Sequence, residues 1–302
     1  MKVWIPDAYA SGQLGRLPSA IELAVFPDDP LSAPDLGEVE FLVPPHRPRE
    51  VVAALAGMRR LRVVQTDSAG VEWLVDHLPR GATLCNARGV HDTATSEWVV
   101  AAILALTKRL PHAHDEQRRG RWRSYEPGEL AGKTVLIVGY GSIGRAVAAR
   151  LEPFGVRLVR VAGRARTGVH GASELPRLVP DADVVVLLVP LSDRTRGLVD
   201  ERFLALMRPG SLLVNASRGA LVDTTALLAA LEQGRIQAAL DVTDPEPLPD
   251  GHPLWTAPGA LITPHVAGAG PGALPRAAAL IRAQLLRHLE GQPLANVVRR
   301  PE

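Results

Sequence analysis

Short apolar runs alternate with longer stretches of helical periodicity through almost the whole chain. This alternation constrains the fold strongly, because it is typical of βα units, in which helices connect consecutive parallel strands. The sequence therefore predicts an α/β protein built on parallel sheets. The expected strands lie at 2–5, 39–43, 61–66, 83–85, 134–138, 157–161, 184–189, 212–215, 237–241 and 261–263.

The chain is long enough for two domains of this kind. It has 302 residues, and a domain takes roughly 150 residues. A polar, irregular stretch at 111–132 separates two α/β series and is expected to be a connector. Helices are expected at 48–57, 93–107, 145–151 and 273–289.

Arginines gather in this connector at positions 118, 119, 121 and 123, around Trp122. One interpretation is a surface for nucleic acid or another polyanion. The other is a solvated connector anchored by its tryptophan, and it is favoured because no RNA- or DNA-binding motif accompanies the arginines. No nucleic-acid partner is expected.

Composition adds few limits. Apolar residues make up 46% of the chain and charged residues 22%, as in ordinary globular proteins, and the formal charge of +2 selects no partner. The single cysteine, Cys85, cannot form an intramolecular disulfide and is expected to be a packed thiol. Neither a signal peptide nor a run of ~18 apolar residues occurs, which predicts a cytoplasmic protein without a membrane partner.

A glycine-rich loop follows the apolar run at 134–138 and opens the helix at 145–151. Gly139, Gly141 and Gly144 give the spacing G-x-G-x-x-G, which in this strand–helix context indicates dinucleotide binding. The first glycine permits the tight turn, the second admits the pyrophosphate, and the third lets helix and strand pack closely. The helix N-terminus favours the bound anion.

The next strand indicates which dinucleotide is bound. An acidic residue at its end would bind the ribose 2′-hydroxyl of NAD, but Ala162 and Gly163 stand there, followed by Arg164 and Arg166. Two arginines could pair with a 2′-phosphate. The sequence therefore predicts NADP(H) in preference to NAD(H); the alternative is that these are two surface arginines.

Three polar residues near the end of the chain carry the chemistry: Arg218, Glu246 and His265. A guanidinium, a carboxylate and an imidazole are the groups needed to hold a 2-oxo acid and to protonate its carbonyl as hydride arrives. Hydride addition builds negative charge on oxygen, so a positioned proton donor and a fixed cation lower the barrier. No metal ion is expected.

Taken together, these segments resemble the D-isomer-specific 2-hydroxyacid dehydrogenases, which include glyoxylate/hydroxypyruvate reductases and phosphoglycerate dehydrogenases. The resemblance is densest over 132–268, and it is looser but recognisable at 68–71 and 86–97. The stretch 163–166 looks like the NADPH-using reductase branch.

The resemblance implies roles for individual residues. Arg218 would hold the substrate carboxylate and carbonyl oxygen, and His265 would be the general acid in reduction and the general base in oxidation. Glu246 would bond the other imidazole nitrogen and favour the protonated form. Backbone N–H groups of Ala69 and Gly70 would bind the substrate carboxylate, with Asp241 on the nicotinamide carboxamide. Further residues expected to line the cofactor are Ser142, Ile143, Val189, Pro190, Thr195, Ala216, Ser217 and Gly268. A substrate contact or a solvated loop is equally open for His46 and Asn86.

The resemblance also implies the architecture. A Rossmann-type dinucleotide-binding domain at 99–267 would be inserted into a flavodoxin-like substrate domain formed by 1–98 and 268–302. The cleft between the domains would hold the active site, and closure would exclude water. A homodimer is expected.

Two rivals remain open. One is a dinucleotide-sensing corepressor, since the family includes such proteins, but the complete set of Arg218, Glu246 and His265 argues against it. The other is a formate-dehydrogenase-like enzyme, which would carry a neutral amide in place of Glu246. The identity of the 2-oxo acid is left open by the sequence.

Overall fold

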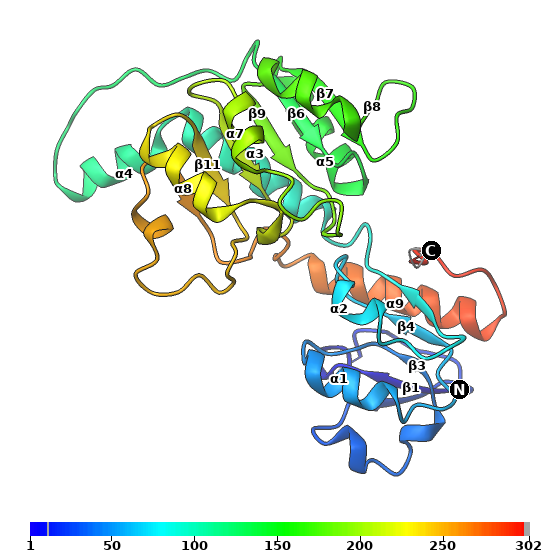
Figure 1. Ribbon diagram of the computed structural model, residues 1–302. Helices are drawn as coiled ribbons and strands as arrows, with labels where there is room; N and C mark the ends of the chain where they lie inside the picture. Colours follow the sequence, from blue (N-terminus) through cyan, green and yellow to red (C-terminus); the bar gives the residue numbers. More distant parts are fainter. Residues whose placement is uncertain (11, 299–302) are drawn as a thin grey trace. The chain divides into compact units, whose positions relative to one another are not determined.

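The computed structural model describes residues 1–10 and 12–298, and the chain divides into two compact units. Unit 1 comprises Met1–His91 and the chain from Gly270 onward, and unit 2 comprises Asp92–Ala269. In Figure 1 unit 1 carries both ends of the colour scale and unit 2 the colours between them. Unit 2 begins at Asp92, the first residue of α3 (Asp92–Thr107).

Unit 1 is built on a five-stranded sheet in which every strand pair is parallel. The strand order is β2-β1-β3-β4-β5, which is the flavodoxin-like order. The fold predicted for this part of the chain is confirmed. The strands are β1 (Lys2–Ile5), β2 (Glu22–Val25), β3 (Val39–Leu42), β4 (Val63–Gln65) and β5 (Thr83–Cys85).

Helices cover both faces of this sheet. On one face α1 (Pro48–Leu55) and α2 (Glu72–Val75) bury Val51, Leu55 and Leu74 against the strands. On the other face α9 (Ala273–Leu289) buries Ala277, Ala278, Ile281 and Leu285. The sequence did not predict β2, because this edge strand is largely exposed and lacks a buried apolar run.

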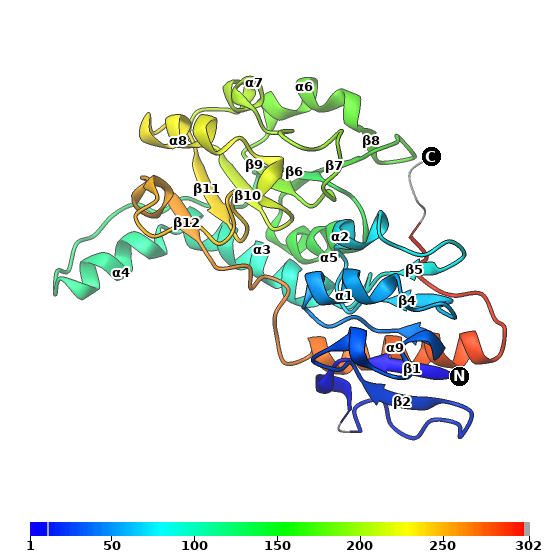
Figure 2. The same ribbon diagram turned by 60° about the horizontal axis from the view of Figure 1, so that its bottom comes forward.

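Unit 2 is built on a seven-stranded parallel sheet with the order β12-β11-β10-β9-β6-β7-β8, which Figure 2 shows from left to right. The chain starts at β6, runs outward through β7 and β8, and then crosses to β9 and continues the other way. The order therefore reverses between β6 and β9. The strands are β6 (Thr134–Val138), β7 (Arg157–Ala162), β8 (His170–Gly171), β9 (Val184–Leu187), β10 (Leu212–Asn215), β11 (Gln237–Leu240) and β12 (Ala260–Ile262).

The faces of this sheet are covered by two groups of helices. On one face α3 and α5 (Ser142–Leu151) bury Val99, Ile103, Val147 and Leu151. On the other face lie α6 (Leu175–Leu178), α7 (Glu201–Leu206) and α8 (Thr224–Glu232), which contribute to a second core. Over the described residues, every helix is too short or too polar to cross a bilayer.

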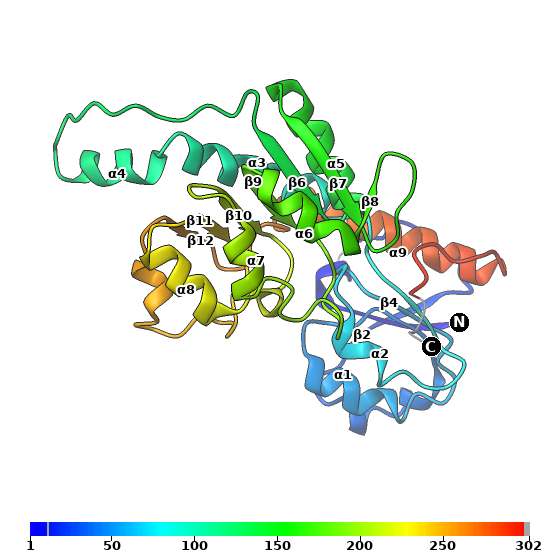
Figure 3. The same cartoon turned by 45° about the horizontal axis from the view of Figure 1, so that its top comes forward.

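The segment expected to be irregular contains a helix, α4 (Leu110–Arg118), so this part of the prediction was wrong. In Figure 3, as in the other two views, α4 and the extended chain that leads to β6 stand apart from the sheet of unit 2. The helix was overlooked because it is polar and buries only Glu116 among its residues.

Three arginines of the connector lie close to the carboxylate of Glu116. Glu116 is 5% exposed, and it accepts hydrogen bonds from Arg119 and Arg121, with Arg123 3.6 Å away. The Arg121 guanidinium is the main reason that the pKa of Glu116 is lowered. Trp122 is 98% exposed, so the expectation that it anchors the connector was also wrong.

Candidate active site

The residues that the sequence singled out in unit 2 follow consecutive strands of one parallel sheet. Parallel strands end at the same edge, so the loops after them are neighbours in the order of the sheet. The loop after β6 holds the glycines, and the loop after β7 holds Arg164 and Arg166. The loops after β9, β10, β11 and β12 hold Val189, Arg218, Glu246 and His265, respectively.

The glycine loop lies where the strand order reverses. At Gly139, with φ +112°, a Cβ would lie 2.4 Å from the carbonyl carbon of Leu188 after β9. At Gly144 a Cβ would lie 2.3 Å from the carbonyl oxygen of Gly139. Both positions therefore require glycine for close backbone packing, as the fingerprint predicts.

Gly141 differs from its two neighbours, because a Cβ built there meets nothing within 4 Å. The residue lies immediately before α5, whose ten residues begin at Ser142. The open space at Gly141 thus lies next to the N-terminus of α5, at the point where open α/β sheets bind the anionic part of a dinucleotide. These residues fit a pyrophosphate.

The two arginines after β7 do not have equal surroundings. Arg166 donates from Nη2 to the carbonyl oxygen of Tyr140 in the glycine loop at 2.9 Å. Arg164 is exposed and makes no side-chain hydrogen bond or ion pair to the part of the chain that the structure describes. Arg166 is therefore a brace between two loops, and Arg164 is the guanidinium with room for an anion.

The loops after β9 and β10 are tied to each other. The hydroxyl of Ser217 donates to the carbonyl oxygen of Val189, and Thr195 closes its own loop by donating to the carbonyl oxygen of Pro190 at 2.8 Å. Buried Asn215, at the end of β10, donates to the carbonyl oxygen of Arg218 at 2.9 Å. The backbone that carries Arg218 is thus held by a buried amide.

Gly219 brings the loop of Arg218 against the loop of Glu246. A Cβ at this position would lie 1.8 Å from the carbonyl oxygen of Thr243, so no other residue fits. The hydroxyl of Thr224, a few residues further on, donates to the carbonyl oxygen of Asp244 at 2.6 Å. The role of Gly219 could not be predicted from the sequence, because its contact joins residues from two different loops.

The imidazole of His265 bonds to the carboxylate of Glu246. Their Nδ1 and Oε1 atoms are 2.5 Å apart, and the side chains are 51% and 38% exposed. Because Nδ1 is used by Glu246, Nε2 is the atom from which a proton can be transferred. The backbone of His265 has φ 53°, a conformation that is costly outside glycine and persists where the surrounding structure holds it.

Asp241 holds the His265 loop in that conformation. Its carboxylate accepts hydrogen bonds from the hydroxyl of Thr263 at 2.5 Å and from the backbone N–H groups of Val266 and Ala267 at 2.9 and 2.8 Å. The N–H of His265 donates to the Asp241 carbonyl oxygen at 2.8 Å. Asp241 is 3% exposed, so it is a buried support for the histidine, which sequence reasoning did not foresee. Its expected contact with a nicotinamide stays a prediction.

In unit 1 the loop of Ala69 and Gly70 has its carbonyl oxygens occupied. Asn86 donates to the Ala69 oxygen at 3.2 Å, and Ser68 donates to the Gly70 oxygen at 2.9 Å. The N–H groups of Ala69 and Gly70 donate to no group within residues 1–10 and 12–298.

The side chain of His46 is 82% exposed, and its Nε2 atom lies 3.5 Å from Oδ1 of Asp67. Cys85 is buried as expected, and burial raises the pKa of its thiol to about 11.

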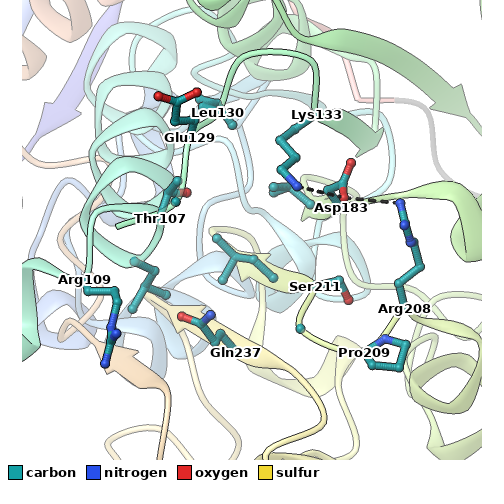
Figure 4. Close-up of a pocket in the computed structure, with 15 residues that line it drawn as sticks. Thr107, Arg109, Glu129, Leu130, Lys133, Asp183, Arg208, Pro209, Ser211 and Gln237 are labelled. Carbon is teal, nitrogen blue, oxygen red and sulfur yellow. Dashed lines mark hydrogen bonds and ion pairs between the residues drawn. The ribbon is translucent and has the colours of Figure 1, made fainter. Parts of the chain in front are cut away.

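A cavity of about 370 Å³ lies at the opposite edge of the unit 2 sheet. It is lined by residues at the amino ends of four strands, including Lys133, Asp183, Ser211 and Gln237. Figure 4 shows Lys133 and Arg208 directed toward Asp183, at 3.6 and 3.3 Å from its Oδ1 atom. None of the residues expected to bind cofactor or substrate lines this cavity.

Similarity to known proteins agrees with this geometry. The pattern of the D-isomer specific 2-hydroxyacid dehydrogenase NAD binding domain matches residues 100–267. The glyoxylate reductase/hydroxypyruvate reductase of Homo sapiens is 35% identical over 250 residues, which cover 78% of this chain and 76% of the human protein.

Two solved structures have the same fold. A D-isomer specific 2-hydroxyacid dehydrogenase from Xanthobacter autotrophicus Py2, in complex with NADPH and MES, superposes with a TM-score of 0.85 at 30% identity and covers 99% of this chain and 98% of that one. The NADPH-dependent glyoxylate/hydroxypyruvate reductase from Sinorhizobium meliloti, in complex with NADP and sulfate, gives 0.86 at 25% identity, with 98% of each chain covered. The chain belongs to the D-isomer specific 2-hydroxyacid dehydrogenase family and is an oxidoreductase that uses a nicotinamide dinucleotide.

Proposed function

We propose that this enzyme reduces a small 2-oxo acid of the glyoxylate or hydroxypyruvate type with NADPH, and that His265 donates the proton. The observation that carries the proposal is the hydrogen bond between Nδ1 of His265 and Oε1 of Glu246, which are 2.5 Å apart. It lies at the edge of the sheet that also holds the glycine loop. The substrate class follows the names of the human and Sinorhizobium relatives.

The chain's own residues would act as follows. Reduced nicotinamide, when bound, supplies the hydride. Glu246 accepts a hydrogen bond from Nδ1–H of His265 and keeps the imidazole in one orientation, so that Nε2–H faces the developing alkoxide. The guanidinium of Arg218 holds the carboxylate of the substrate and stabilises the charge that grows on the carbonyl oxygen. In oxidation the same Nε2 takes the proton back.

We assign the carboxylate of the substrate a second contact in unit 1. The N–H groups of Ala69 and Gly70 donate to no described group, while the carbonyl oxygens of both residues are already bonded. Two adjacent N–H donors on a loop with fixed carbonyls are suited to a carboxylate. Replacement of Ala69 by Pro removes one donor and should raise the KM for the 2-oxo acid more than it lowers kcat.

We infer a preference for NADPH, carried by Arg164. This exposed guanidinium lies two residues beyond the end of β7, next to the place where a carboxylate would favour NAD. Arg164→Ala should lower kcat/KM for NADPH by roughly 10- to 100-fold, the value of a hydrogen bond to a charged group, and leave NADH unaffected. Arg166→Ala is the matched control, because its brace to Tyr140 serves both cofactors and its loss should affect them equally.

Steady-state rates with both cofactors and a panel of 2-oxo acids test the proposal. The expected result is turnover of glyoxylate or hydroxypyruvate with a higher kcat/KM for NADPH. A higher value for NADH, unchanged in Arg164→Ala, would refute the cofactor assignment. Saturable NADPH binding without turnover on any 2-oxo acid would favour a dinucleotide-sensing regulator instead.

We also propose a cytoplasmic homodimer, as the resemblance implies. A reducing compartment suits a chain whose single cysteine is a buried thiol. Sedimentation equilibrium would then report twice the chain mass of 32.3 kDa, and a single chain mass at micromolar concentration would contradict the dimer.

A further inference from the structure

A carboxylate lies beside the position assigned to the cofactor's pyrophosphate. The hydroxyl of Ser142, the first residue of α5, donates to Oδ2 of Asp92, the first residue of α3. Both side chains are half-buried. Only the hydroxyl group of Ser142 therefore lies between the negative charge of Asp92 and the N-terminus of α5.

The packing of the two helices holds this charge in place. Val99 and Ile103 of α3 share a core with Val147 and Leu151 of α5, so the two N-termini cannot separate easily. The hydroxyl of Ser96 donates to the carbonyl oxygen of Asp92 at 2.5 Å and fixes the first turn of α3. The carboxylate is therefore not a mobile surface group.

This arrangement has two consequences for an anion at the N-terminus of α5. The hydroxyl of Ser142 is directed to Asp92 and is not available to a phosphate oxygen. The Asp92 carboxylate also repels a pyrophosphate across a half-buried gap, where charges are screened less than in water. Both effects oppose the attraction that the helix N-terminus provides.

We propose that Asp92 is a built-in negative charge that weakens dinucleotide binding and speeds its release. The inference rests on the proposed function, because it assumes that the pyrophosphate binds at the glycine loop. It gives Asp92 a role in setting cofactor affinity that is separate from the proton transfer at His265.

Asp92→Asn is the direct test, because it keeps the shape and the acceptor for Ser142 and removes the charge. NADPH fluorescence titrations should show binding about 3- to 30-fold tighter than wild type at low salt. The gain should shrink at high salt, where charges are screened. Stopped-flow displacement should show slower release of both NADPH and NADP⁺, so kcat falls if release limits turnover, whereas the KM for the 2-oxo acid stays unchanged.

Glu97→Gln is the matched control. It removes the same charge from the same helix, but its carboxylate lies 3.7 Å from Arg150 on α5, away from the glycine loop. Its affinity for NADPH should stay within about 2-fold of wild type, because the charge is distant from the pyrophosphate.

Weaker or unchanged NADPH binding by a folded Asp92→Asn protein would overturn the inference, as it would mean that Asp92 only positions Ser142. If wild-type protein binds neither NADPH nor NADP⁺ saturably, the proposed function fails and the inference fails with it.

Discussion

The two edges of the sheet in unit 2 are made by the same strands but differ in their chemistry. At the amino edge a cavity of about 370 Å³ is lined by charged groups that pair with one another, since Asp183 lies between Lys133 and Arg208. At the carboxyl edge Gly141 leaves open space before α5, and His265 presents one ring nitrogen while Glu246 holds the other. A hollow therefore does not by itself identify the candidate active site. The groups that can take part in a reaction are the better guide to it.

The backbone makes the same distinction. The carboxyl-edge loops include a histidine with positive φ, a buried aspartate that accepts three hydrogen bonds, and glycines pressed against other loops. A positive φ outside glycine costs stability and persists where the surroundings hold it in place. These features lie at the edge of the sheet that we propose to be the reactive one.

The largest effect should come from His265→Ala at the carboxyl edge. Loss of the proton donor should lower kcat for 2-oxo acid reduction by about 10²- to 10⁴-fold, while NADPH binding is kept because the glycine loop is untouched. Gln237→Ala, at the amino edge on the neighbouring strand β11, is the control and should stay within about 2-fold of wild type. Near-normal turnover in His265→Ala would contradict the proposed difference between the two edges, as would a large loss in Gln237→Ala.

An intermediate effect is expected from Gly219→Ala. Its Cβ would lie 1.8 Å from the Thr243 carbonyl oxygen, so the loops of Arg218 and Glu246 must move apart. We expect the free energy of unfolding, measured by urea denaturation, to fall by about 1–3 kcal/mol. We also expect kcat to fall in steady-state assays of the same variant.

Gly171→Ala is the control for this overpacking. There the nearest atom to the new Cβ is 3.5 Å away, an ordinary contact, and φ is −82°. Equal losses of stability in the two variants would show that the close approach at Gly219 is not the cause.

The smallest effect should be the pH-dependent one of Glu174, beside the short edge strand β8. Its carboxylate accepts a hydrogen bond from the backbone N–H of Gly171 at 3.0 Å and from Arg177 and His170. The bond from Gly171 is the main reason that the pKa of Glu174 is lowered to about 2. A lowered pKa means that the stabilisation is present above the ordinary carboxyl range and is lost as pH falls toward 2.

Glu174→Gln should therefore lower the Tm at pH 7 by a few degrees and make little difference near pH 2. Differential scanning calorimetry of both proteins across this range measures it. A Tm difference that is constant with pH would show that the carboxylate charge is not responsible.

Much of the fold could be predicted, because buried strands leave a local signal. β1, β5, β6, β10 and α9 have the bounds expected from apolar runs and periodicity. Elements without such runs were overlooked: β2 is an exposed edge strand, β8 has two residues, and α4 is polar. Trp122 was misjudged for a related reason, since an apolar residue usually indicates burial and this one is 98% exposed.

The candidate site was predicted as residue types in order along the chain, and one pair of these residues, Glu246 and His265, is in direct contact. What the sequence did not reveal are the supports that act between distant segments. Examples are the buried carboxylate of Asp241 under His265, Gly219 against Thr243, and Asp92 beside Ser142. Each of these contacts depends on how the loops meet, which no local pattern records.

Transfer of deuterium from C4 of labelled NADPH to hydroxypyruvate tests the central claim most directly. We expect mass spectrometry to find one deuterium at C2 of D-glycerate with the wild-type enzyme. In His265→Ala saturated with the same cofactor, this transfer should fall by about 10²-fold or more. Equal transfer by the two proteins, or a product of the L configuration, would contradict the account.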